Sequence, residues 1–435
     1  MEIKLKDERL NKRWFKLVRS QIKVASSLAA GVGGLPDNLS AFAATQAAWR
    51  FYSNERIELK ELVQPLRQYV RTEVATTDSP FVLVAHDWCK LSYPGHEFRT
   101  DLATLSNESD VGYEMTTSLA ISADDGAPLA PVEMHLRTAD GILSTRETFI
   151  ETTNHLDQVL PTMNASLKWN LGKPIVHIID READSIGHMR QWEEAGHLML
   201  IRADDRQVLC DGQEIKLSDI RREVELQQKF QPVGAALFHG RKAKLEVAEI
   251  AVVLHRPARM MVHNKKVDVP GKPLAMRLIL VRIVDDKGKV LTQWYLLSNA
   301  PSNWADAAQL ARCYYWRWRI ESFFKLLKSH GFQLEGWLQE TGVAIARRIL
   351  VVSMAAVTVW KLMADTSPKA TQFKQVLIRM SGRQMKKTRP FTAPALLAGL
   401  CSLLAVLETL ENIDLQSIKS MTNNLNLPIP LLKPG

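Results

Sequence analysis

The sequence predicts an α/β fold, with a mixed sheet in the middle of the chain and helical segments at both ends. Three observations predict it. Short apolar runs that lead to an acidic residue, at 81–85 and 175–179, are typical of buried strands. Helical periodicity dominates residues 1–70 and the chain after Asn303. Between them, residues 205–292 contain alternating polar and apolar stretches that indicate further strands.

These changes of pattern divide the chain. A length of 435 residues is enough for two to four domains. The predicted parts are a helical domain at 1–70, the first part of the α/β core at 71–204, a β-rich insertion at 205–292, the second part of the core at 293–365 and a helical C-terminal region at 366–435 that is a candidate for dimerisation.

The N-terminal segment is basic and helical. Leu10, Trp14, Leu17 and Val18 form an apolar stripe at helical spacing, and eight Lys or Arg against three acids lie between Met1 and Val24. Gly31–Pro36 predicts the end of this helix, and a second helix should run from about Ser40 to Tyr52. The segment is either a solvated surface helix or part of a small helical domain that docks on DNA. A formal net charge of +9 favours a polyanionic partner.

The middle of the chain supplies the predicted core. Its order of elements is strand, strand, strand, helix, strand, helix, strand, which is typical of a ribonuclease-H-like mixed sheet. The strands are expected at 81–85, 114–122, 128–137, 175–179 and 198–202, and the helices at Thr145–Trp169 and Asp184–Ala195.

Composition excludes several classes of protein. The charged start lacks the apolar segment of a signal peptide. The apolar runs Ile349–Trp360 and Ala393–Leu407 are shorter than the ~20 residues of a membrane span, so we predict buried helices and no membrane partner. Four cysteines without a CxxC pair, and histidines without HExxH spacing, argue against zinc and fit a reducing cytoplasm.

Four residues near the C-terminal third carry the most chemical information. Tyr314, Arg317, Glu321 and Lys328 are separated by three, four and seven residues, and at ~100° per residue they would share one face of a helix. A carboxylate can hold Mg²⁺, and Arg and Lys beside it suit phosphate oxygens. The stripe is therefore either half of a phosphoryl-transfer site or an amphipathic helix with ordinary ion pairs.

Two aspartates extend this pattern. Asp87 and Asp180 each follow a predicted buried strand, and ligand sites in α/β sheets gather at strand ends. Together with Glu321 they would give three carboxylates, enough to hold two Mg²⁺ ions, which Mn²⁺ can replace. The alternative is that each aspartate only starts a turn or caps a helix.

The motifs resemble those of the IS-four family of bacterial DDE transposases. The resemblance lies in the spacing Tyr314-x2-Arg-x3-Glu-x6-Lys328, in Asp180-Arg-Glu-Ala-Asp184, and in Leu91-Ser-Tyr93 shortly after Asp87. It spans roughly residues 5–365. Trp88 and Cys89 depart from it, because threonines follow the first aspartate in the relative.

The resemblance implies roles for individual residues. It makes Asp87, Asp180 and Glu321 the catalytic, metal-holding triad. It assigns DNA binding to five other residues: Tyr314, Arg317, Lys328, Arg202 and Trp294. The last of these would stack on a flipped base, although Trp294 is equally well explained as a core aromatic of a strand.

The family also implies an activity and its partners. The expected activity is cut-and-paste transposition of an insertion sequence, with strand nicking, a DNA hairpin and strand transfer, by a homodimer acting on transposon ends and target DNA at the bacterial nucleoid. Residues 1–70 would bind the DNA end. The rival functions are a ribonuclease-H-like nuclease without strand transfer and a transposase-derived repressor. The presence of all three acids disfavours the repressor.

Overall fold

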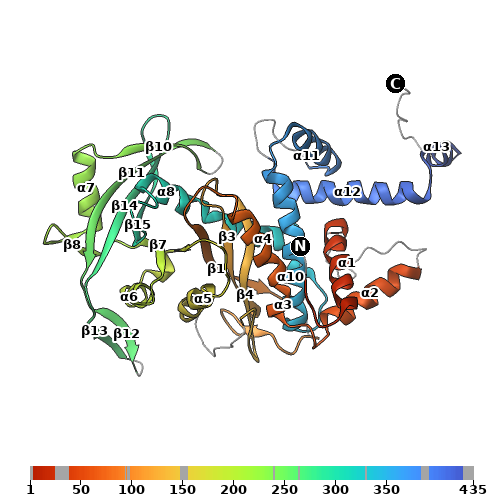
Figure 1. Ribbon diagram of the computed structural model, residues 1–435, viewed down its shortest axis with the longest axis horizontal. Helices are drawn as coiled ribbons and strands as arrows, with labels where there is room; N and C mark the ends of the chain where they lie inside the picture. The colour runs from red at the N-terminus through yellow and green to blue at the C-terminus, as the bar shows by residue number, and fades with distance from the viewer. Residues whose placement is uncertain are drawn as a thin grey trace.

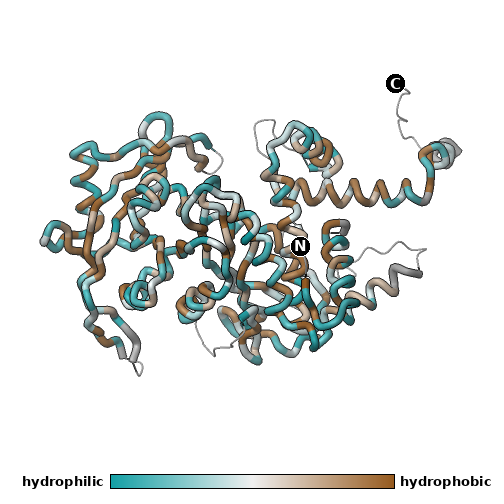
Figure 2. The backbone as a smooth tube through the Cα atoms, viewed as in Figure 1, coloured by the Kyte–Doolittle hydropathy of each residue, from teal (hydrophilic) through white to brown (hydrophobic). Residues whose placement is uncertain are grey.

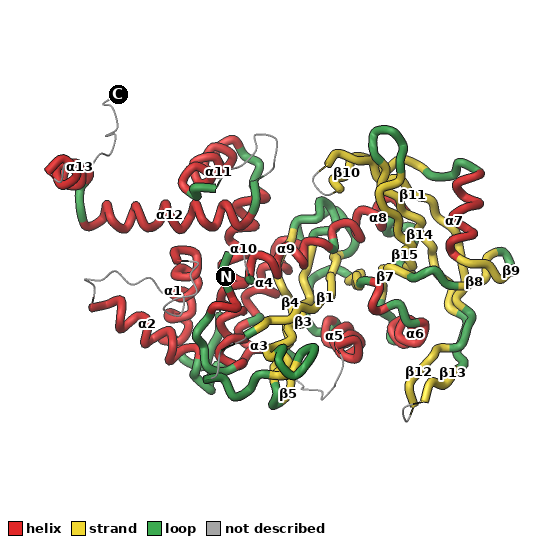
Figure 3. The backbone as a smooth tube through the Cα atoms, turned by 180° about the vertical axis from the view of Figure 1, so that it is seen from behind, coloured by secondary structure: helices red, strands yellow, loops and turns green. Residues whose placement is uncertain are grey.

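A computed structural model of the chain describes residues 3–24, 39–93, 95, 98–146, 155–238, 241–262, 265–328, 331–383 and 391–424. One large sheet crosses the molecule (Figure 1). Figure 3 shows that the N-terminal and C-terminal helices lie at the same end of the molecule, opposite the strands of the predicted insertion.

The strands are β1 (Val82–Ser92), β2 (Ala103–Thr104), β3 (Val111–Ile121), β4 (Pro128–Thr138), β5 (Gly141–Ser144), β6 (Ile175–Ile179), β7 (Leu198–Ala203), β8 (Gln207–Cys210), β9 (Gln213–Lys216), β10 (Gln231–Phe238), β11 (Arg241–Leu254), β12 (Ala258–Val262), β13 (Lys265–Val269), β14 (Leu274–Val284) and β15 (Val290–Ser298).

The α-helices are α1 (Glu8–Val24), α2 (Leu39–Tyr52), α3 (Leu59–Leu62), α4 (Gln64–Val74), α5 (Val159–Ser166), α6 (Ile186–Glu194), α7 (Leu217–Leu226), α8 (Ala307–Trp316), α9 (Trp318–Leu327), α10 (Gly342–Ala364), α11 (Pro368–Met380), α12 (Ala393–Asn412) and α13 (Leu415–Asn424). Short 3-10 turns lie at η2 (His155–Gln158), η3 (Arg181–Ala183) and η4 (Leu334–Gly336).

The centre of the sheet has the order β4-β3-β1-β6-β7. The first strand, β1, pairs antiparallel with β3 on one side and parallel with β6 on the other, and β6 pairs parallel with β7. A first strand flanked by a hairpin on one side and by parallel strands on the other is the ribonuclease-H-like arrangement. The predicted α/β class, with a mixed sheet and helical ends, is confirmed.

The β-rich segment at 205–292 extends this same sheet. Strand β15 pairs antiparallel with β7, and β14, β11, β8 and β9 continue outward from it. A second hydrophobic cluster, which includes Val208, Ile220, Val252, Leu278 and Leu297, holds these strands to β7 and α6. The segment is β-rich as expected, while the boundaries drawn at 205 and 292 stay predictions.

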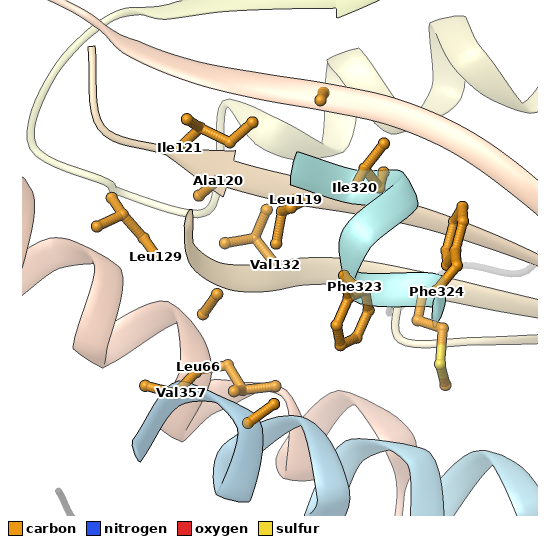
Figure 4. Close-up of a cluster of buried hydrophobic side chains, with 14 of the residues drawn as sticks. Leu66, Leu119, Ala120, Ile121, Leu129, Val132, Ile320, Phe323, Phe324 and Val357 are labelled. Carbon is orange, nitrogen blue, oxygen red and sulfur yellow. The ribbon is translucent and has the colours of Figure 1, made fainter. Parts of the chain in front are cut away.

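Helix α10 is the central core helix. The predicted buried run Ile349–Trp360 lies within it, and 89% of its most apolar window is buried inside the protein. Figure 4 shows Val357 of α10 near Leu66 of α4, on the side of the sheet where Phe323 of α9 also packs. The sheet and α10 therefore share one core with the N-terminal helices.

The prediction of a buried helix at Ala393–Leu407 is wrong for its second half. Helix α12 packs on α11 and α1 near its start, but Val406 and Leu407 are exposed. Only 22% of its apolar window Ala393–Glu411 is buried, although by length and composition this helix, like α10, could cross a membrane. Figure 2 shows the apolar character continuing along the helix beyond the packed part. The sequence pattern could not reveal the exposure of Val406 and Leu407, because an apolar run shows only that a helix is hydrophobic and not which segments pack against it.

Two local predictions differ from the structure, and a third is not tested by it. Strand β1 does not end at Asp87 but continues to Ser92, because β3 supplies hydrogen-bond partners along its whole length. The helix predicted at Thr145–Trp169 is confined, in the described residues, to His155–Ser166. The expected helix end at Gly31–Pro36 lies outside the described residues.

The predicted apolar stripe of the N-terminal helix is buried in the protein core. Trp14 and Leu17 of α1 are each 2% exposed, and α1 packs against α10 and α12. The neighbouring Phe15 is 44% exposed, and the exposed Arg9, Lys16 and Arg19 share its solvent side of the helix. Helix α1 is thus packed onto the core of the protein, and its basic surface is held in a fixed place.

We predict that Trp14→Ala lowers the free energy of unfolding by about 3–5 kcal/mol, because it removes a fully buried aromatic ring. Phe15→Ala is the matched control and should cost less than about 1 kcal/mol, since its ring is half exposed. Urea unfolding of both variants measures this. Equal effects of the two substitutions would show that α1 does not use this face against the core.

Candidate active site

The pairing of β1 with β6 brings two of the predicted acids together. The parallel register runs from Val82 opposite Ile175 to Ala85 opposite Ile178. Two residues further along each strand are Asp87 and Asp180. Because side chains alternate between the two faces along a strand, the side chains of both aspartates are expected on the same face of the sheet. Their charges act on one another, and Asp180 contributes to raising the pKa of Asp87.

Asp87 is partly buried in the sheet. Its side chain is 15% exposed, its Oδ1 accepts a hydrogen bond from the backbone N–H of Trp88 at 2.9 Å, and its Oδ2 lies 3.0 Å from Arg317. Burial raises the pKa of Asp87 to about 6, and the charge of Arg317 opposes this rise. At neutral pH the carboxylate of Asp87 is ionised, and its partly buried negative charge needs a positive charge beside it.

Glu321 reaches this place from a helix that is interrupted. The prediction of one continuous helix face is wrong, because α8 ends at Trp316 and α9 begins at Trp318, with Arg317 at the junction. The backbone N–H of Arg317 donates to Tyr314 O at 3.1 Å, which is the tighter 3-10 pattern. Figure 4 shows Ile320, Phe323 and Phe324 of α9 in the cluster of buried side chains. The side chain of Glu321 on the same helix is 42% exposed.

Arg317 bridges two of the acids. One terminal nitrogen donates to Asp87 at 3.0 Å, and the other donates to Glu321 at 2.9 Å. The arginine side chain is only 9% exposed, whereas Glu321 is 42% exposed. A buried guanidinium between two carboxylates balances their charge and fixes the distance between β1 and α9.

Asp180 also serves as a local cap. Its Oδ1 accepts a hydrogen bond from the backbone N–H of Glu182 at 2.9 Å and thereby starts η3. The capping alternative that the sequence left open is therefore present in the structure. Capping occupies one oxygen of the carboxylate, so it does not exclude a second role for Asp180.

These carboxylates suit a hard divalent cation. In the described residues, no three His, Cys, Asp or Glu side chains are close enough together to hold a metal as they stand. The reason at this site is visible, since Arg317 lies between Asp87 and Glu321. Carboxylate oxygens are the ligands that Mg²⁺ prefers, and the buried Asp87 requires a countercharge, so this donor set fits the ion.

The predicted phosphate-binding residues lie around the acids. Tyr314 is buried, which raises its pKa, while Arg317 and Arg202 of β7 act to lower that pKa. Lys328, at the end of α9, donates to the backbone oxygen of Lys90 at 2.7 Å and pairs with Glu335 at 2.9 Å. The structure thus brings Tyr314, Arg202 and Arg317 together and places Lys328 against the far end of β1.

Trp294 lies in the core, and the sequence reasoning missed its exposed neighbour. Trp294 of β15 is 6% exposed and contacts Tyr314, with 5.5 Å between ring centroids. Trp318 lies 6.3 Å from Trp294 and is 37% exposed. Burial supports the core alternative for Trp294. Trp318 could have been singled out from sequence as the residue beside Arg317 in the signature helix.

A groove of about 960 Å³ lies beside α9. It separates this helix from the β10–β11 hairpin and combines cations with aromatic rings. Among its lining residues are Lys242, Lys244, Tyr315, Trp318, Arg319 and Phe391. Tyr315 attaches the hairpin to the signature segment, because its hydroxyl exchanges hydrogen bonds with the backbone of Leu237. Basic and aromatic side chains together suit a nucleic-acid strand.

A histidine pair supports the aspartates from the other face of the sheet. His86, one residue before Asp87, contacts His177 of β6 through ring nitrogens 2.8 Å apart and Ser118 of β3 at 3.0 Å. Burial lowers the pKa of His86 to about 3 and that of His177 well below its usual value, so both rings are neutral near pH 7. The pair joins β1 to β6 directly behind the acids, a role that no motif predicted.

Two family models match the sequence. Residues 130–358 match the model described as "Transposase DDE domain", and residues 1–57 match the one described as "Transposase DNA-binding". The first match covers more than half of the chain and includes Asp180 and Glu321. It begins after Asp87, so the place of Asp87 in the site rests on its strand register and its contact with Arg317.

No curated protein sequence matches the chain significantly. Among solved structures, the chain is similar to a piggyBac transposase synaptic complex with hairpin DNA, at 11% identity over 99% of this chain and 78% of that one, with a TM-score of 0.37. It is also similar to the Drosophila P element transposase strand transfer complex, at 9% identity over 87% and 79%, with a TM-score of 0.19. Such TM-scores do not establish a common fold.

We predict a pH-dependent stability difference between the wild type and Asp87→Asn in EDTA. The fold raises the pKa of Asp87 to about 6, so it favours the protonated acid. The stabilisation of the folded state by protonated Asp87 is fully present below about pH 4 and is lost as the pH rises through about 6. The variant should therefore gain stability relative to the wild type between pH 4 and 7, by at most about 3 kcal/mol.

Urea unfolding at several pH values measures this difference. Asp286→Asn, which changes an exposed aspartate between β14 and β15, is the control and should give a flat difference. A flat difference for Asp87→Asn as well would contradict the burial of its charge.

Proposed function

Because this chain belongs to the DDE transposases, in the IS-four family and with an N-terminal DNA-binding segment, we propose that it moves an insertion sequence by cut-and-paste transposition. The substrates are the terminal inverted repeats of the element and a target DNA. The reaction is phosphoryl transfer that depends on Mg²⁺, with nicking of one strand followed by strand transfer.

One observation carries this proposal above all others. Asp87 from β1 and Glu321 from α9 are 234 positions apart in the sequence, and both accept hydrogen bonds from the guanidinium of Arg317. Asp180 follows β6 at the position that corresponds to Asp87 in the parallel register. Such convergence is not needed for the fold, since burying a carboxylate costs free energy. It is what a site that holds cations requires.

Each group has a proposed task in phosphoryl transfer. Two divalent ions, when bound by Asp87, Asp180 and Glu321, would activate the attacking oxygen and stabilise the leaving one. DDE transposases generally use divalent metal ions. Arg317 and Arg202 are proposed to contact phosphate oxygens, with the buried Tyr314 packed beside them. Lys328 holds the end of β1 through Lys90 O and so also fixes the position of Asp87.

The basic outer surface of α1 is proposed to recognise the transposon end. The family match shows that residues 1–57 are a DNA-binding segment. Arg9, Lys16 and Arg19 are exposed on α1 and are therefore accessible to a DNA backbone. Phosphate contacts release counterions, so binding through this surface should weaken steeply with added salt.

A hairpin intermediate is the proposed route for the second strand. A tight DNA turn requires a base to leave the stack, at a cost of a few kcal/mol, and an aromatic platform recovers ~1–3 kcal/mol per base. The exposed Trp318 has the accessibility that such a platform requires, and the buried Trp294 supports it from beneath. The groove beside α9 would receive the displaced strand.

The protein is proposed to act as a homodimer on two DNA ends in the bacterial cytoplasm, at the nucleoid. Two ends must be held together for cut-and-paste movement, and each needs an active site. The location is supported by the cysteines Cys89, Cys210, Cys313 and Cys401, all of which are free thiols.

We predict that Asp87→Ala, Asp180→Ala and Glu321→Ala each abolish Mg²⁺-dependent cleavage of end DNA while binding to that DNA stays nearly intact. The physical reason is that the carboxylates hold cations and do not contact phosphate directly. Cleavage and gel-shift assays on the same preparations measure both. If a variant still cleaves at more than a trace, the substituted residue does not belong to the triad. A separate assay for joining of the nicked 3′ end to target DNA distinguishes a transposase from a nuclease.

We predict that Trp318→Ala nicks the first strand at close to the wild-type rate but forms the hairpin poorly. An abasic site at the flipped position should partly restore hairpin formation, since no base has to be expelled. Trp294→Ala is the comparison variant, and its buried position predicts lower stability with equal loss of both steps. Strand-resolved cleavage assays with melting curves distinguish the two. Equal loss of both steps in Trp318→Ala would remove the platform role.

A further inference from the structure

We propose that Arg317 is an exchangeable countercharge, which occupies the carboxylates in the DNA-free protein and passes to a DNA phosphate when the substrate binds. The exchange would make divalent-cation binding depend on DNA. This inference rests on the proposed function, because it concerns regulation of the same site. It adds a condition under which the site accepts its metal.

The contacts of Arg317 show what it holds in the absence of DNA. Its two terminal nitrogens are used on Asp87 and Glu321, at 3.0 and 2.9 Å. Its Nε is buried and has no hydrogen-bond partner among the described residues. A buried donor without a partner is costly, so the guanidinium is incompletely satisfied in this position.

A phosphate group offers Arg317 a better set of partners. Arginine binds phosphate with two parallel hydrogen bonds, and an incoming strand could also meet the unused Nε. The side chain is anchored at the α8–α9 junction, which is only a single residue long, and Glu321 on the solvent side is 42% exposed. In the proposed exchange the guanidinium turns past Glu321 toward solvent, while α8 and α9 keep their places.

The same geometry opposes metal binding without DNA. A divalent ion on Asp87 and Glu321 would lie beside a guanidinium that already uses the same carboxylate oxygens. Two positive groups cannot share these oxygens at hydrogen-bonding distance without strong repulsion. When a phosphate draws Arg317 away, both carboxylates become available. By linkage, DNA should raise metal affinity, and metal should raise DNA affinity by the same factor.

The consequence is protection against premature chemistry. Without DNA the acids are neutralised internally, so the protein does not gather ions that could hydrolyse unintended bonds. With the strand in place, the ions enter at the phosphate that is to be attacked. The exchange thus ties assembly of the site to the presence of substrate.

The test measures Mn²⁺ binding to the full-length protein by the electron paramagnetic resonance signal of free Mn²⁺, with and without a duplex that carries the terminal repeat. Without DNA, Arg317→Gln should bind Mn²⁺ about tenfold more tightly than the wild type, a factor in the usual range of coupling between sites. The duplex should tighten binding to the wild type by a similar factor and tighten binding to the variant much less.

Arg312→Gln is the matched control. Arg312 lies on α8, one turn before Arg317, but donates to the side-chain oxygen of Gln309 at 3.3 Å and contacts no carboxylate in the described structure. Its removal should leave DNA-free Mn²⁺ affinity unchanged. Arg317→Lys covers the case in which Arg317→Gln does not fold, as judged by its melting curve. One ammonium cannot bridge both acids in the same way, so this variant should also bind Mn²⁺ more tightly than the wild type.

Equal DNA-free affinities of the wild type and the Arg317 variants would overturn the exchange. Failure of the proposed function gives a different result. In that case Asp87→Asn and Glu321→Gln would leave Mn²⁺ binding in the presence of DNA unchanged, because the carboxylates would not be its ligands. Loss of binding in these two variants, together with equal affinities for the Arg317 variants, keeps the triad and removes only the exchange.

Discussion

Parallel hydrogen bonding between β1 and β6 is the constraint on which the site depends. It sets Asp87 of β1 and Asp180, directly after β6, at corresponding positions of the strand pair, although they are 93 positions apart in the sequence. The same register sets His86 against His177 on the opposite face, where both rings are buried and neutral. One face of the strand pair therefore carries the charged Asp87 and Asp180. The other face carries the neutral hydrogen bond between His86 and His177, which joins the two strands.

Charge compensation explains why the third acid must come from a helix. Burial raises the pKa of Asp87 to about 6, and the positive charge that opposes this rise is that of Arg317. The α8–α9 junction delivers Arg317 and Glu321 together, one as countercharge and one as a further acid. The apolar side of α9 fixes this arrangement, since Phe323 and Phe324 are packed in the core. The position of Glu321 thus depends on hydrophobic packing on the other side of its own helix.

The segments around the core are joined to it more closely than separate domains would be. The β-rich segment continues the central sheet through β15, and this brings Trp294 beneath Tyr314 and Trp318. Helix α1 packs on α10, so the surface that carries Arg9, Lys16 and Arg19 has a fixed orientation to the acids. A DNA end bound at α1 would consequently meet Asp87, Asp180 and Glu321 at one defined spacing along the duplex.

The sequence by itself determined the elements and the chemistry. Buried apolar runs predicted the strands, and helical periodicity predicted α1, α2 and α10. The spacing of Tyr314, Arg317, Glu321 and Lys328 singled out the candidate site. These signals are local, because each lies within a single continuous segment of the chain. Tertiary structure decided the rest. The extension of β1 past Asp87, the break at Arg317, the burial of Trp294, the exposure of Trp318 and the open end of α12 all depend on which distant segment lies against each residue. Hydrogen bonding and desolvation depend on the groups that lie near a residue in space. A pattern along the chain does not show which distant segment supplies those groups.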